Sequence, residues 1–404
     1  MKGNAAAVVW MDPLFVIPHQ MYTGYMTLYM LEFNLSLIQV GIITSISLIA
    51  RILFMLFSAY ITDRLGRRVT TILFDSICWI GGQVFWLIGG SFEIFVIGAL
   101  VNASVQVVGN SIFCLMLEDS TPDVRFHAYN FLQVASILSG FFAPLGGLLI
   151  RNMTIVPAMR MMLTIGLVCV ILQVTIRYYL TSETVIGKQK MMEMKHKKIG
   201  GIFKSYIPIL ARIFKNKLLM LVILIRSLNN IQTTIRVTFL IVLLTKGLGF
   251  PPENFATFQV ITAVITLLVL LFITPNLSAN KSNKPLYFGI AIHIVATVLL
   301  LVSHNNSNYL LLICNTVLSA LATGIITPRI DAISSNILSN EDRTVGNAMM
   351  SGILLMLSTP FGYIGGLLSN IDLKLPFVLI LVIFILCLIL VGVANRIQKE
   401  AEIS

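Results

Sequence analysis

The sequence predicts an all-α polytopic membrane protein with twelve transmembrane helices in two pseudo-symmetric six-helix bundles. Three observations predict this fold class. Of the 404 residues, 57% are hydrophobic and 11% are charged, and the mean hydropathy of +0.91 lies far outside the range of soluble proteins. Apolar stretches long enough to cross a bilayer recur along the whole chain. The longest polar interruption, residues 181–217, leaves six of them on either side.

The predicted spans begin and end where polar, charged or turn-forming residues interrupt the apolar stretches. The first stretch follows Lys2 and contains Asp12-Pro13, and no small-residue cleavage site follows it. We therefore expect a membrane helix there rather than a removable signal. The spans are 6–28, 37–61, 69–89, 92–117, 126–150, 156–179, 218–245, 254–275, 285–303, 309–337, 344–369 and 373–395.

Most lysine and arginine residues outside the spans lie in every second connecting segment, that is, on one side of the membrane. Only Arg151, Lys246 and Lys374 lie in the segments of the opposite side. Since basic residues are retained on the cytoplasmic side of a membrane, we expect both termini in the cytoplasm and the spans in the cell membrane. The net charge of +11 then faces anionic lipid and requires no nucleic acid partner.

Residues 181–217 are predicted to form a cytoplasmic basic linker between an N-terminal bundle, 1–180, and a C-terminal bundle, 218–404. Within the linker, apolar residues of 199–217 gather on one side of a helix and basic residues gather opposite. This pattern predicts an amphipathic helix on the inner membrane surface. A binding segment for a partner protein is the alternative.

No pattern of a catalytic or metal site is present. The five cysteines all lie within predicted spans, at spacings unlike those of a metal site. The sequence contains no Walker-type phosphate loop, no His-Glu-x-x-His and no Gly-x-Ser-x-Gly. We therefore expect no catalytic residues, no metal and no cofactor.

The densest charge is the loop Asp63-Arg64-Leu65-Gly66-Arg67-Arg68 between the second and third predicted spans, where Gly66 permits a tight turn. This loop resembles the signature of the major facilitator superfamily, Gly-x-x-x-Asp-Arg-x-Gly-Arg-Arg, with Ala59 at the first glycine. A basic orienting loop that contains an aspartate by chance is the alternative. The resemblance implies a monomeric secondary transporter that works by alternating access, nearest to the drug/proton antiporter-like permeases.

The resemblance also implies a role for this loop. In the family it bridges helices at the inner face and stabilises the outward-open state, and here its arginines can reach acids at the end of the fourth span. Two charged residues near the inner end of the tenth span are expected to make gate contacts. The predicted inner-gate latch consists of Asp63, Arg64, Gly66, Arg67, Arg68, Glu118, Asp119, Arg329 and Asp331.

The two halves also carry a similar Gly-Gly motif with a nearby proline, in the fifth and eleventh spans. Such residues let helices pack closely and bend. The fifth span partly matches the Gly-Pro-x-x-Gly signature of antiporters in this family, with Ala143-Pro144 and Gly147, although Ser139 stands where a further glycine is usual. The predicted helix-bending residues are Pro144, Gly146, Gly147, Pro360, Gly365 and Gly366.

Polar residues recur at helical spacing in spans one, four, seven and ten, and each is costly in hydrocarbon unless it faces protein or water. These four spans line the central cavity in the family that the chain resembles. Hydrogen bonding to neighbouring helices is the alternative role. The candidate cavity residues are Thr23, Asn102, Gln106, Asn110, Arg226, Asn230, Thr233, Arg236, Asn315, Ser319 and Thr323.

Asp12 is the one carboxylate deep in these polar stripes, so it is the leading candidate for a proton carrier, with His19 as a second. Arg226 and Arg236 instead suit an anionic substrate, and Asn102 stands where many exporters of the family carry an arginine. We expect a secondary active transporter, driven by a proton or other ion gradient, that exports a small amphipathic organic compound. The alternatives are uptake of an organic anion by symport and a non-transporting membrane sensor.

Overall fold

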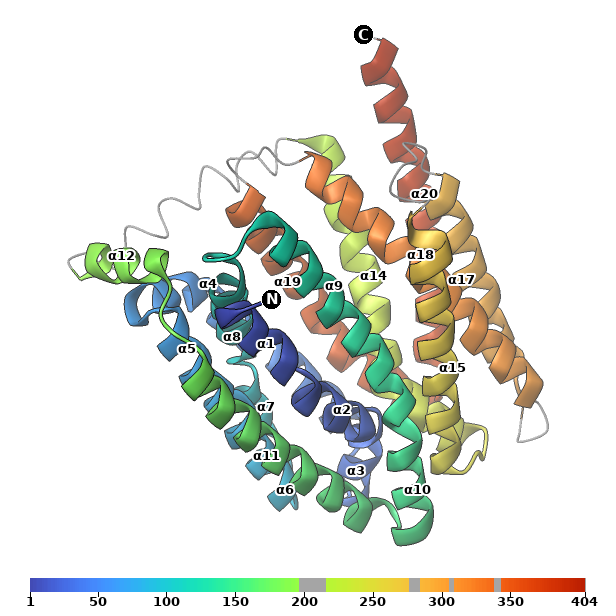
Figure 1. Cartoon of the computed structure of the whole chain (residues 1–404). Coiled ribbons are helices and arrows are strands. Elements are labelled where there is room, and N and C mark those ends of the chain that lie inside the picture. The colour runs from blue at the N-terminus through green and yellow to red at the C-terminus, as the bar shows by residue number, and fades with distance from the viewer. Residues whose placement is uncertain (196–215, 276–283, 305–308, 338–342, 404) are drawn as a thin grey trace. The chain divides into compact units, whose positions relative to one another are not determined.

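The computed structural model describes residues 1–195, 216–275, 284–304, 309–337 and 343–403. Every regular element in these ranges is helical, and eleven helices are long and apolar enough to cross a membrane. The chain forms two compact units, Met1–Phe203 and Lys204–Ser404, each of which is described by itself (Figure 1). The all-α membrane fold class is thereby confirmed. Most of the predicted amphipathic helix of 199–217 lies outside the described residues.

The first unit holds five of the eleven long helices. These spans are α4 (Leu37–Leu65); α5 (Arg67–Asp75), the π-helical turn Ser76–Gly81 and α6 (Gly82–Ile88); α7 (Phe92–Asn102) and α8 (Val105–Leu117); α9 (Pro122–Ser139), a 3₁₀ turn and α10 (Ala143–Met153); and α11 (Ile155–Leu180). After α11 comes the short helix α12 (Val185–Met194), which packs on α4.

The first predicted span, 6–28, folds as a series of short helices. These are α1 (Gly3–Met11), α2 (Pro13–Tyr22), a 3₁₀ turn (Thr23–Tyr25) and α3 (Met26–Glu32). Pro13 opens α2 at a position where its missing N–H is not needed, and Pro18 lies inside that helix. These segments are not among the eleven helices that are long and apolar enough to cross a membrane.

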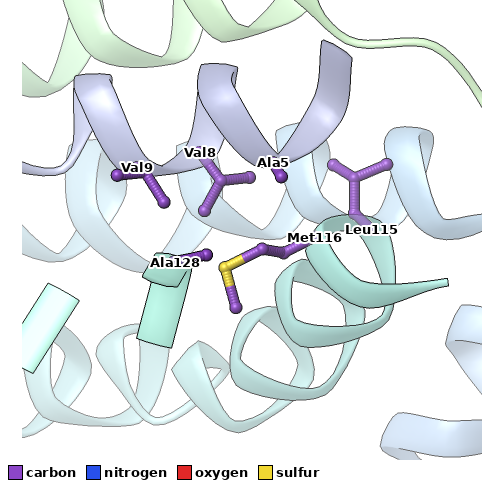
Figure 2. Close-up of a cluster of buried hydrophobic side chains, with 6 residues drawn as sticks. All are labelled: Ala5, Val8, Val9, Leu115, Met116 and Ala128. Atoms are coloured by element: carbon purple, nitrogen blue, oxygen red, sulfur yellow. The ribbon is translucent and has the colours of Figure 1, made fainter. Parts of the chain in front are cut away.

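The N-terminal helix α1 is held to the first unit by apolar packing. Figure 2 shows Val8 and Val9 of α1 beside Met116 of α8 and Ala128 of α9, in a cluster that also contains Ala5 and Leu115. Each of these side chains is at most 3% exposed. Burial of this apolar surface fixes α1 on the ends of α8 and α9.

The second unit holds the other six long helices. They are α14 (Lys217–Val242) with a π-helical turn (Leu243–Gly247), α15 (Phe255–Leu268) with its flanking 3₁₀ turn (Pro252–Asn254) and π-helical turn (Val269–Ile273), α17 (Lys284–Val302), α18 (Tyr309–Ile337), α19 (Arg343–Ile371) and α20 (Leu375–Ile403). Helix α14 packs against α18, α19 and α20, while α17 packs against α18 and α20.

Two glycines of the Gly-Gly motifs mark close helix contacts. A Cβ on Gly146 of α10 would overlap the backbone carbonyl oxygen of Met21 on α2, and a Cβ on Gly365 of α19 would lie 2.6 Å from Cε2 of Phe239 on α14. The neighbouring Gly147 and Gly366 are buried as well. Both motifs follow a proline, since Pro144 lies in the first turn of α10 and Pro360 lies inside α19. A role of these residues in helix bending stays a prediction.

Candidate functional site

A pocket of about 370 Å³ lies among α14, α18 and α19 in the second unit. Eight of its ten lining residues are polar or charged, and the other two are Ile330 and Leu354. Four predicted cavity residues, Arg226, Asn230, Thr233 and Thr323, belong to its wall. The complete lining is Arg226, Asn229, Asn230, Thr233, Thr323, Thr327, Ile330, Asp331, Ser351 and Leu354.

The charged groups of this pocket neutralise each other. Nη2 of Arg226 lies 3.1 Å from Oδ1 of Asp331, which joins α14 to α18. The amide of Asn230 donates to the hydroxyl of Ser358 on α19 at 2.9 Å. The pocket wall therefore presents mainly neutral polar groups, and its threonines, Thr233 among them, are exposed.

Arg236 lies one helical turn beyond Thr233 on α14 and has a different environment. Its Nη2 donates to Oδ1 of Asn315 on α18 at 3.1 Å. The amide of Asn315 in turn donates to the backbone carbonyl of Ala296 on α17 at 2.6 Å, so its orientation is fixed. Among the described residues, no carboxylate forms an ion pair with Arg236. In the described part of the chain, the hydrogen-bond partner of this half-buried cation is thus a neutral amide.

A buried histidine on α17, His293, contacts a residue of the pocket wall. His293 is 1% exposed, and its ring stacks on Phe384 of α20 with centroids 4.4 Å apart. Its Nε2 lies 3.1 Å from the hydroxyl oxygen of Thr323, which lines the pocket. His293 was not predicted from the sequence, because its span is almost wholly apolar; a lone imidazole in such a span was the available signal. Ser319, also a predicted cavity residue, is 7% exposed on α18 between Asn315 and Thr323.

The first unit contains a buried ion pair that was not predicted from the sequence. Nη1 of Arg177 on α11 lies 2.5 Å from Oδ2 of Asp75 on α5, and both side chains are at most 5% exposed. The helix continues after Asp75 as the π-helical turn. Asp12 lies within electrostatic reach of both members of this pair. The three residues form a small charged group shared by the first, third and sixth predicted spans.

His19, the second predicted proton-coupling residue, lies among aromatic rings. Its ring centroid is 5.0 Å from that of Phe15, 5.4 Å from that of Tyr22 and 5.3 Å from that of Trp79. Thr23 follows in the 3₁₀ turn and is half-buried. Asp12 and His19 therefore lie on α1–α2 with an apolar, aromatic environment around the histidine.

The predicted cavity amides of the fourth span mostly bond to neighbouring helices. The amide of Asn102 donates to the carbonyl of Cys78 at 3.3 Å, and that of Asn110 donates to the hydroxyl of Thr62 at 3.2 Å. Gln106 is half-buried on α8. Two of these three side chains thus tie α7 and α8 to the helices beside them.

The residues of the predicted latch form a dense network in the first unit. Arg67 is 4% exposed and pairs with Asp63 at 2.8 Å and with Glu118 at 2.9 Å. Arg64 donates to the hydroxyl of Tyr60. The other two predicted members, Arg329 and Asp331, belong to the second unit, where Arg329 is buried and Asp331 pairs with Arg226 as described above.

Residues that follow α11 form further hydrogen bonds with the residues of the predicted latch. The carboxylate of Glu183 accepts the backbone N–H groups of Arg67 at 2.9 Å and Arg68 at 3.0 Å, which caps the N-terminus of α5. Gly66 has a φ of +87°, and a Cβ there would lie 2.5 Å from Oε2 of Glu183. Asp119 accepts the backbone N–H of Val185 at 3.4 Å. Glu183 has no motif of its own in the sequence, and its contact spans 116 residues.

Comparisons with known proteins give this arrangement its context. The sequence model of the Major Facilitator Superfamily matches residues 14–318, and no curated protein sequence matches the chain significantly. The nucleoside transporter NupG has a similar structure, with 15% identity, a TM-score of 0.71 and coverage of 98% of this chain and 99% of that chain.

Two further solved structures share the fold. One is a bacterial homologue of the human lysosomal transporter Spinster, in an inward-facing and occupied conformation. It matches with 15% identity, a TM-score of 0.70 and coverage of 97% of this chain and 96% of that chain. The human organic anion transporter MFSD10 matches with 11% identity, a TM-score of 0.62 and coverage of 96% of each chain. The family resemblance of the charged loop is thereby confirmed: the chain belongs to the major facilitator superfamily and is a membrane transporter.

Proposed function

We propose that this protein is a secondary active transporter of small organic anions that works by alternating access. One observation carries the proposal: Arg236 lies in a membrane span, one helical turn after Thr233 of the pocket wall, and its guanidinium donates to the neutral amide of Asn315. A cation in hydrocarbon is costly unless it is paired or hydrated. A substrate carboxylate or phosphate would supply the missing charge through a charge-assisted hydrogen bond.

The charge balance of the pocket supports a substrate with one negative charge. Arg226 and Asp331 neutralise each other at 3.1 Å. Arg236, one turn beyond the pocket wall, adds a positive charge that no described carboxylate balances. The neutral hydroxyl and amide groups of the wall are suited to a polar body on the substrate, and 370 Å³ is the volume of a small organic molecule.

We propose that proton movement through the first unit energises transport. Asp12 lies within electrostatic reach of the Asp75–Arg177 pair. A proton on Asp12 would change the net charge of the three residues Asp12, Asp75 and Arg177. It would thus change the free-energy difference between the inward-open and outward-open states. The protein acts as a monomer in the plasma membrane, with both termini cytoplasmic as the distribution of basic residues predicts.

A second candidate function is proton-coupled export of a small amphipathic compound. The aromatic rings of Phe15, Tyr22 and Trp79 around His19 favour it, because they offer apolar surface to such a compound, and Asp12 precedes α2, which carries Phe15, His19 and Tyr22. In this mechanism Asp12 would bind a cationic substrate or a proton in alternation.

Transport by purified protein in proteoliposomes tests the proposal. The substrate panel contains a monocarboxylate, its neutral amide and a lipophilic cation of similar size. The variants are Arg236→Gln and, as a matched control at the predicted outer side of the membrane, Lys246→Gln. We expect accumulation of the carboxylate by the native protein and by Lys246→Gln, with at least a tenfold loss in Arg236→Gln. Transport of the lipophilic cation alone, unaffected by Arg236→Gln, would favour the export function instead.

A further inference from the structure

A second cavity, of about 250 Å³, lies in the first unit between the start of α5 and the end of α11. Its wall is apolar along the helix face that Val69, Ile72, Leu73 and Ser76 share at helical spacing. Val69 is 49% exposed and Leu73 is 44% exposed, so this face is open to its surroundings. At the end nearest the charged loop, the wall is completed by Arg68 and Tyr178.

Arg68 differs from the other arginines of the loop. Arg67 has two carboxylate partners, Asp63 and Glu118. Arg68 donates from Nη2 to the backbone carbonyl of Tyr178 at 2.7 Å, and its guanidinium lies 4.6 Å from the centroid of the Tyr178 ring. Within the described part of the chain, its side chain has no carboxylate partner, and its Nε is buried without a hydrogen bond.

Two acids of the first unit, Glu183 and Asp75, already have partners. Glu183 accepts the backbone N–H of Arg68 rather than its guanidinium, and that carboxylate is shared with the N–H of Arg67. On α11, Arg177 is occupied by Asp75 inside the unit. The cavity wall therefore combines an apolar face with one cation, Arg68, that forms no ion pair among the described residues.

We propose that this cavity is a binding site for an anionic phospholipid, with the phosphate on Arg68 and the upper part of an acyl chain along Val69, Ile72 and Leu73. Arg68 lies at the start of a membrane span, Arg67–Ile88, so the cation is at the membrane boundary and the apolar wall extends into the span. Anionic lipids are concentrated in the cytoplasmic leaflet, the side on which the charged loop is predicted to lie.

The apolar wall is what distinguishes a lipid from free phosphate. Inorganic phosphate could use only the guanidinium, whereas a phospholipid also covers the exposed faces of Val69 and Leu73. An acyl chain along this wall also makes van der Waals contacts that free phosphate cannot make. The ring of Tyr178 holds the guanidinium in place over the mouth of the cavity, which limits its rotamer freedom before the lipid binds.

Native mass spectrometry of the purified full chain tests the site, with phosphatidylglycerol and phosphatidylcholine of identical acyl chains as probes. The variants are Arg68→Gln, which removes the cation, and Leu73→Trp, which fills the cavity. Arg125→Gln, an exposed arginine on the same predicted face, and Leu148→Trp, an exposed leucine of α10, are the matched controls. Melting temperatures confirm that each variant is folded.

We expect the native protein and both controls to retain phosphatidylglycerol at least fivefold more than phosphatidylcholine. Arg68→Gln should lose this preference, and Leu73→Trp should lose retention of both lipids. Should Arg68→Gln fail to fold, Leu73→Trp against Leu148→Trp decides the question. Unchanged retention in Leu73→Trp, an unchanged headgroup preference in Arg68→Gln, or displacement of the lipid by equimolar inorganic phosphate would overturn the proposal.

Discussion

The buried ion pair between Asp75 and Arg177 provides a quantitative test of the first unit. Both side chains are at most 5% exposed, and the two charges are 2.5 Å apart at their nearest atoms. With charge centres about 4 Å apart and an effective dielectric constant of about 20, the attraction is about 4 kcal/mol. Removal of one partner also leaves an uncompensated buried charge, so each single variant should lose about 3–5 kcal/mol of unfolding free energy.

Removal of both partners should cost much less than the sum of the two single losses. In Asp75→Asn with Arg177→Gln, no unpaired charge remains, and two neutral amides occupy the same space. We therefore expect a coupling energy of about 2–4 kcal/mol in the double-mutant cycle. The exposed pair Lys190–Glu193, with nitrogen and oxygen 3.0 Å apart, is the matched control, because a surface pair contributes about 1 kcal/mol or less.

The assay is reversible unfolding of purified protein in mixed micelles, followed by tryptophan fluorescence. Single variants that lose no more than about 1 kcal/mol would refute the reasoning, since the pair would then behave like Lys190–Glu193. A double variant as unstable as the sum of the singles would refute it too, because the two side chains would then contribute independently.

Two further predictions concern the latch and proton coupling. Gly66→Ala should destabilise the first unit by about 2–4 kcal/mol, because it combines a positive φ with a clash against Glu183. Gly90→Ala, which also has a positive φ but nothing within 4 Å of its Cβ, should lose only about 1–2 kcal/mol, and equal losses in unfolding assays would contradict the close approach. Asp12→Asn should retain substrate binding but abolish substrate-driven proton movement in proteoliposomes; normal proton flux in this variant would exclude Asp12 as the carrier.

The fold class could be predicted from the sequence because bilayer thickness and hydrophobicity set the length of each span. The charged loop also identified the family from local residues. The first span is different: its apolar character predicted one helix for 6–28, whereas the segment is divided into shorter helices before Pro13 and at the 3₁₀ turn Thr23–Tyr25. Hydropathy indicates which segments can lie in the membrane, but it does not indicate whether such a segment forms one continuous helix.

The polar groups of the site were only partly visible in the sequence. Arg226 and Thr233 belong to a periodic stripe on one helix, and both line the pocket. Asp75 and Arg177 are 102 residues apart and belong to no stripe, so their pairing depends on tertiary packing. His293 is a single polar residue in an apolar helix, and its contact with a pocket threonine could not be inferred from spacing.

The central claim is that Arg236 binds the acid group of the substrate. The most direct measurement is equilibrium binding of a carboxylate and of its neutral amide to the native protein and to Arg236→Gln. A hydrogen bond to a charged group contributes about 1.5–3 kcal/mol, so the native protein should prefer the acid by about 10- to 150-fold. This preference should fall to about one in Arg236→Gln. A preference that persists in Arg236→Gln would show that another group recognises the anion, and would contradict the account.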